Sequence, residues 1–207
     1  MFPTAQNSAT SLAAALTESK VQETTSNAGK AFLKFDFKSG DFTFGRDAVD
    51  VTDEEICINT YSIQHGWVLW VNGSAQKEMV PFNQSLPAPM PAQQGNEPSE
   101  ARGFEARFLD DEDTIIVFES NSYGGRQGVD TLLNAVKGRA LSGEETFLFP
   151  IVKLTSTSYK AKQGNTIHNP KFEIVGWVDA EGNRQTETAQ LESTTTEEAP
   201  VRRRRQA

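Results

Sequence analysis

The chain has 207 residues, of which 37% are hydrophobic and 23% charged, and its formal net charge is -8. This composition is typical of a globular protein, and the negative charge argues against general attraction of nucleic acid to the whole surface. No apolar run reaches the roughly 18 residues of a membrane span, and no basic segment followed by an apolar one opens the chain. The sequence therefore predicts no membrane segment and no secretory signal, and its one cysteine, Cys57, is expected to be a small buried residue in a reducing cytoplasm.

Three regions follow from composition along the chain. Residues 1–29 are rich in Ala, Ser, Thr, Asn and Gln, which predicts a flexible arm. Residues 30–179 carry the large apolar side chains, and we expect them to form a single β-barrel domain. Residues 180–207 carry few large apolar side chains and end in four arginines, Arg202 to Arg205, which predicts a disordered tail.

Alternating apolar side chains predict strands in the first part of the domain. A hairpin is expected from residues 31–37 and 41–45, followed by strands at 55–59, 66–71, 103–109 and 114–119. The segment 80–99 contains five prolines and no steady periodicity, which predicts a long loop. Thirteen phenylalanines in the chain predict a phenylalanine-rich core.

One helix is predicted after these strands. Val129, Leu132, Leu133 and Val136 recur at helical spacing within residues 128–139. The last two strands are expected at residues 147–154 and 171–178. The fold class is therefore mainly β with one interior helix, an OB-like antiparallel β-barrel with disordered arms at both ends.

Candidate catalytic and metal-binding groups are few. The chain has two histidines and one cysteine without ligand spacing, and it lacks a nucleophile elbow, a Walker loop and a dinucleotide fingerprint. The acidic run at residues 110–113 is interpreted as a solvated turn, with a divalent-ion site as the alternative. We therefore expect no enzyme activity and no cofactor.

Cations beside an aromatic ring give the clearest binding signal. Residues 120–177 carry seven basic and four acidic side chains, a net charge of +3, whereas residues 1–119 carry a net charge of -10. Single-stranded nucleic-acid binders combine cations that contact phosphates with aromatic faces that stack on bases. A polar hairpin tip is expected at Tyr159, Lys160 and Lys162, and the predicted phosphate contacts also include Lys153 and Lys171.

Two further places are candidates for the same ligand. The segment 122–128, SYGGRQG, precedes the predicted helix, where glycines and Arg126 could contact a phosphate; the alternative is a tight turn between strand and helix. Trp67 and Trp70 should face opposite sides of a strand, so that one of them is exposed or lies under the proline-rich loop and could stack on a base.

The segments 149–154, 158–160 and 169–177 (FPIVKL, SYK and NPKFEIVGW) resemble the C-terminal part of small phage and prophage proteins of the single-stranded DNA-binding type. The resemblance extends over residues 30–178 and implies an OB-like domain with a role in phage DNA replication or recombination, located in the host cytoplasm. Many such proteins end in an acidic tip that recruits partner proteins. This chain has arginines near its end instead, so the resemblance does not imply that its tip recruits partners.

The sequence thus predicts a non-enzymatic single-stranded DNA-binding protein, with RNA as an alternative ligand. Replication or recombination proteins are the expected protein partners, no membrane is expected, and a homo-oligomer is left open. The alternative function is a structural or protein-interaction module, such as a virion component or an adaptor.

Overall fold

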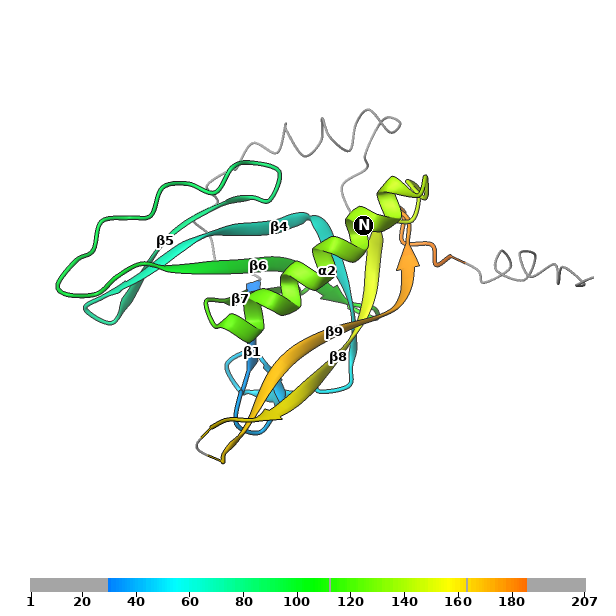
Figure 1. Cartoon of the computed structure of the whole chain (residues 1–207). Helices are drawn as coiled ribbons and strands as arrows, with labels where there is room; N and C mark the ends of the chain where they lie inside the picture. Colours follow the sequence, from blue (N-terminus) through cyan, green and yellow to red (C-terminus); the bar gives the residue numbers. More distant parts are fainter. Residues whose placement is uncertain (1–29, 112, 163, 186–207) are drawn as a thin grey trace, which may run out of the picture.

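The computed structural model describes residues 30–111, 113–162 and 164–185 (Figure 1). The predicted arm at 1–29 and the arginines at the chain end lie outside the described residues. The strands are β1 (Lys30–Phe35), β2 (Phe42–Phe44), β3 (Val49–Asp50), β4 (Glu55–Val71), β5 (Ser74–Pro81), β6 (Ser99–Phe108), β7 (Ile115–Ser120), β8 (Phe149–Lys160) and β9 (Thr166–Val178), and the one helix among these residues is α2 (Tyr123–Leu141).

All nine strands belong to one sheet. Their order is β3-β2-β1-β7-β6-β4-β8-β9, and β5 pairs with β4 outside this series. The neighbours are antiparallel except for β1 and β7, which run parallel. The sheet curls into a half barrel, and α2 lies diagonally across it (Figure 1).

The long strand β4 pairs with different neighbours along its two halves. Its first residues pair with both β6 and β8, and its pairing with β6 changes register between Asn59 and Gln64. Beyond this irregularity β4 pairs with β5 along a hairpin that ends at residues 71–74. Such irregularities increase the local twist and bend of a strand. The β4–β5 hairpin therefore projects as an arm away from the part of the sheet that β8 and β9 complete (Figure 1).

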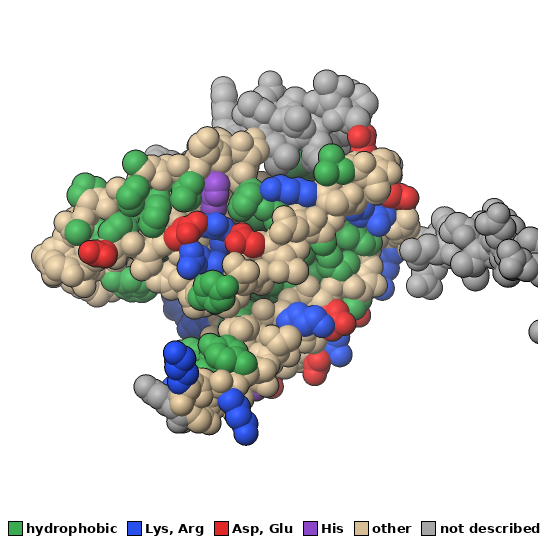
Figure 2. All heavy atoms as spheres, in the orientation of Figure 1, with side chains coloured by type: hydrophobic (Ala, Val, Ile, Leu, Met, Phe, Trp, Pro, Cys, Tyr) green, Lys and Arg blue, Asp and Glu red, His purple; other side chains and the backbone are tan. Residues whose placement is uncertain are grey.

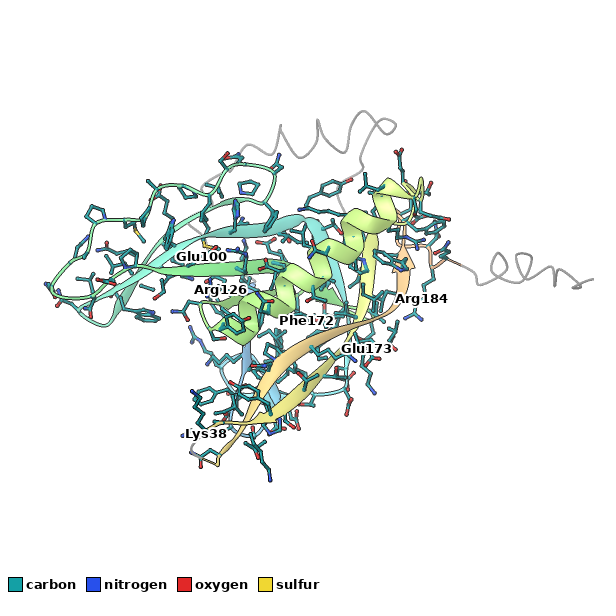
Figure 3. The ribbon with its side chains drawn as sticks, viewed as in Figure 1. Lys38, Glu100, Arg126, Phe172, Glu173 and Arg184 are labelled. Carbon is teal, nitrogen blue, oxygen red and sulfur yellow. The ribbon has the colours of Figure 1, made fainter. Side chains whose placement is uncertain are left out.

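The core lies between the curled sheet and α2. The apolar stripe predicted for the helix is confirmed, because Val129, Leu132, Leu133 and Val136 are all buried. The predicted phenylalanine-rich core is also confirmed: the rings of Phe104, Phe118 and Phe172 lie 5.1–5.3 Å apart and pack with buried Phe42. Figure 3 shows Phe172 on β9, beside the helix.

The mainly β class with one helix is confirmed, and several boundaries differ from the predicted ones. The helix begins at Tyr123 rather than at residue 128, because the Ser122 side chain caps it there. Glycines in its first turns disfavour helix, so the sequence pattern predicted a later start. The two strands predicted at 55–59 and 66–71 form the single strand β4, because the chain stays extended between them, where Ile63 is buried in the core and the pairing with β6 changes register. The strands β3 and β5 were not predicted, as neither has a regular apolar alternation.

Residues 180–185, which the sequence placed in the disordered tail, are part of the folded structure. Residues 179–185 fold back on β9, with Asn183 and Gln185 joined by backbone hydrogen bonds to Asp179 and Trp177. The side chain of Asp179 accepts hydrogen bonds from the backbone N–H groups of Glu181 and Asn183, at 3.0 and 2.8 Å. Local side-chain bonds thus stabilise a turn in residues that the sequence assigned to the tail.

Candidate nucleic-acid interface

A groove of about 680 Å³ is bounded by the two projecting hairpins and β1. Its walls come from β1, the ends of β4 and β5, the connection from β7 into α2, and the end of the β8–β9 hairpin. In Figure 1, β1 lies between the β4–β5 arm and the β8–β9 hairpin. The volume falls within the range of ligand pockets, roughly 300–1,000 Å³.

Every exposed aromatic side chain of the described residues lines this groove. Their exposed fractions range from 42% to 73%, and they are Phe32, Phe37, Trp70, Tyr123 and Tyr159. The remaining aromatic side chains described are buried or half-buried. Aromatic rings are costly to leave in water, and a gathered set of them on one surface marks a binding site.

The strand β1 explains two of the groove residues. Leu33 is buried in the core, so its neighbours Phe32 and Lys34 point to the opposite face of the strand, and both line the groove. The ammonium group of Lys77, on β5, lies 5.7 Å from the centre of the Phe32 ring and forms an ion pair with Glu119. The groove floor is thus aromatic and carries little net charge.

The hairpin predicted around Tyr159 is present and its tip is exposed. Tyr159 pairs with Ile167, and the turn closes with a 2.8 Å hydrogen bond from the N–H of Ala161 to the carbonyl of Asn165. Gly164 has a φ of +85°, a conformation that glycine adopts without strain. Lys160 and Lys162 are exposed, as predicted, and Figure 2 shows cationic side chains at the end of this hairpin beside an apolar group.

The hairpin is held in place by the turn between β1 and β2. The N–H of His168 donates to the carbonyl of Phe37 at 2.8 Å. Gly40 in the same turn has a φ of +87°, and a Cβ there would lie 2.5 Å from the His168 ring. This close contact fixes the position of the hairpin, and with it Tyr159, relative to β1. Figure 3 shows Lys38, from the same turn, beside the end of the hairpin.

The start of α2 supplies the most exposed ring. Ser122 is the N-cap, and its hydroxyl accepts a 3.0 Å hydrogen bond from the N–H of Gly125. The glycines of the predicted phosphate loop are helical residues: a Cβ on Gly124 would lie 2.1 Å from Asn169, and one on Gly125 would lie 2.0 Å from Ser120. The reason for these glycines is close packing of the helix start, which leaves Tyr123 exposed at the groove.

Three predicted phosphate contacts are engaged in ion pairs and do not line the groove. Arg126 donates to Glu100 at 2.7 Å, and Figure 3 labels the two residues next to each other. Lys153 lies 3.0 Å from Asp53, and Lys171 lies 3.3 Å from Glu173. The groove instead includes Lys34, which has no ion-pair partner among the described residues.

The two predicted tryptophans lie on opposite faces, as the strand periodicity requires. Trp70 is exposed by 56% and lines the groove. Trp67 is half-buried under the proline-rich loop, where its indole N–H donates to the carbonyl of Pro87 at 2.8 Å. The structure therefore brings Trp70 and Tyr159 to one groove and leaves Trp67 outside it.

The sequence reasoning missed Phe32, Lys34, Phe37 and Tyr123. The first two could have been found from the alternation of β1, because Leu33 and Phe35 form the apolar face and Phe32 lies opposite to them. No sequence pattern indicated that Tyr123 is exposed, because its exposure depends on the packing between α2 and β9.

The remaining polar groups offer no metal centre. Among residues 30–111, 113–162 and 164–185, no group of three His, Cys, Asp or Glu side chains could hold a metal ion. Asp111 accepts hydrogen bonds from the N–H groups of Asp113 and Thr114, which accords with the predicted turn. Cys57 is buried as predicted, and burial raises the pKa of its thiol to about 12.

The described residues include no helix that is long and apolar enough to cross a membrane. Comparison of the chain with protein-family models, curated proteins and solved structures finds no match.

Proposed function

We propose that this protein binds single-stranded DNA in the groove between its two hairpins, in the service of phage DNA replication or recombination. The observation that carries the proposal is the gathering of all exposed aromatic side chains of the described part in one groove, with Lys34 beside them. Single-strand binders without base readout stack bases on such rings, at about 1–3 kcal/mol per base.

The proposed stacking residues are Tyr159 and Trp70, the latter being one of the two tryptophans that the sequence indicated, with Phe32 and Tyr123 added by the groove. Lys34 and Lys160 are the proposed phosphate contacts closest to these rings in sequence. RNA is the alternative ligand, because the groove presents rings to which any unpaired base can stack. No enzymatic step is part of the proposal.

A relationship to OB-like domains belongs to the same proposal. It is supported by a strongly curled, mostly antiparallel sheet with a single helix packed on it. The sheet has nine strands and the helix follows the seventh, so the relationship concerns architecture rather than the number of strands. Action in the host cytoplasm is the corresponding proposal for location.

The test is a titration of a fluorescein-labelled oligo-dT of about 30 nucleotides with the full-length chain, in which binding is monitored by fluorescence anisotropy. We expect saturable binding that unlabelled oligo-dT competes away. If no binding is seen even at about 20 mM salt, the proposal is wrong, and the alternative of a protein-interaction module becomes the one to test by pull-down with the full chain.

A further inference from the structure

The groove differs in charge from what a phosphate-tracking channel requires. The charged side chains that line it are Lys34, Lys77 and Glu119, and the last two neutralise each other in an ion pair. The whole chain has a net charge of -8. Attraction of a polyanion is therefore weak at this surface, although five exposed rings are available there.

Few cations remain available for phosphates near the rings. Lys34 lines the groove, whereas Lys38 and Lys160 do not line it and are the chain neighbours of the groove residues Phe37 and Tyr159. None of these three lysines has an ion-pair partner among the described residues. Two cations that a longer phosphate track would need, Arg126 and Lys171, do not line the groove, and each lies beside a carboxylate, that of Glu100 and Glu173 respectively. Lys34 in the groove, with Lys38 and Lys160 next to its rings in the chain, would together neutralise about three phosphates of a bound strand.

From these observations we infer that the groove binds an unpaired strand mainly through its bases, and that its affinity for single-stranded nucleic acid depends only weakly on salt. The inference rests on the proposed function and deepens it, because it specifies the ligand as exposed base faces rather than a phosphate backbone. A duplex hides its base faces by stacking and pairing, so the groove discriminates against duplex.

The expected salt dependence follows from the number of neutralised phosphates. For single strands the slope of log K against log salt is about -0.7 per phosphate, so three phosphates give about -2. Affinity then falls about 20-fold between 50 and 200 mM salt. Five phosphates, the number of cationic side chains predicted from the sequence, would give a slope of about -3.5 and a fall of about 130-fold.

The experiment measures the affinity of the full-length chain for oligo-dT at salt concentrations from 50 mM to 1 M. To remove the contribution of the terminal arginines, it uses the variant R202Q/R203Q/R204Q/R205Q, which keeps the chain length. We expect a slope of about -2 or shallower, measurable binding at 1 M salt, and no competition by a blunt duplex.

Two variants separate stacking from charge. Y159A should weaken binding by about 5- to 150-fold at every salt concentration without changing the slope, since one stacked base contributes about 1–3 kcal/mol. K34Q should make the slope shallower by about 0.7.

Binding with a slope steeper than about -3, or lost entirely at 1 M salt, would overturn the inference while leaving the proposed function intact. Equal binding of a blunt duplex would count against both the inference and the proposed function, because a duplex hides the base faces. Absence of any binding by the full-length chain even at about 20 mM salt would instead refute the proposed function.

Discussion

Trp70 and Tyr159 lie at the ends of two different hairpins and face the same groove, with exposed fractions of 56% and 52%. One comes from β4 and the other from β8, and the strand β1 lies between the hairpins (Figure 1). Two exposed rings that face one groove offer separate stacking surfaces to the bases of one strand.

The first prediction concerns these two rings. W70A and Y159A should each weaken oligo-dT binding by about 5- to 150-fold, because each removes one stacking surface. W67F is the matched control, since Trp67 lies under the proline-rich loop and bonds to Pro87 outside the groove. The measurement is anisotropy at fixed salt; equal losses for W70A and W67F would count against a role for the groove.

The second prediction separates the cations at the groove from those in ion pairs. K34Q should weaken binding about two- to tenfold at low salt, because it removes a cation that lines the groove. K153Q should leave the affinity unchanged, since Lys153 lies 3.0 Å from Asp53 and is not a groove residue. A larger loss for K153Q than for K34Q would favour the phosphate contacts predicted from sequence.

The third prediction tests the packing of the helix start. G125A should destabilise the protein by about 1–3 kcal/mol, since a Cβ there would lie 2.4 Å from the Cβ of Ser120. G138A in the same helix has open space around the new Cβ and should stabilise it by about 0.5–1 kcal/mol. Urea unfolding of both variants measures whether the free energy of unfolding falls for G125A and rises for G138A. Equal effects of the two substitutions would mean that Gly125 does not pack as described.

The fourth prediction follows from the burial of Cys57. Because burial raises the pKa of its thiol from 9.0 to about 12, the native thiol stays protonated between pH 7 and 9 and should react slowly with iodoacetamide. Unfolding in urea should restore ordinary reactivity. Rapid native labelling that increases with pH over this interval would contradict the buried position.

The same shift has a consequence for stability. The folded-state pKa of the thiol lies above its unfolded value, so its contribution to stability is complete below about pH 9 and is lost as pH rises further. C57A removes this alkaline dependence, and comparing the unfolding free energy of the two proteins between pH 8 and 10 measures it.

Most of the strands, the helix and two of the exposed aromatic residues of the groove, Trp70 and Tyr159, were among the features predicted from the sequence. The alternation of apolar residues and the helical spacing of Val129 and Val136 are local patterns, so they indicated the strands and the helix. The hairpin at Tyr159 was also found from local turn residues. What could not be predicted is which cations stay available, because the pairing of Arg126 with Glu100 depends on the sheet bringing β6 beside α2. The exposure of Tyr123 depends in the same way on contacts with β9.

The most direct test of the central claim is to find where a bound strand touches the protein. The full-length chain is crosslinked by ultraviolet light to an oligonucleotide containing bromodeoxyuridine, and the modified peptides are identified by mass spectrometry. The account predicts crosslinks at Phe32, Trp70, Tyr123 or Tyr159, which line the groove. Crosslinks confined to residues outside the groove, or none at saturating oligonucleotide, would contradict it.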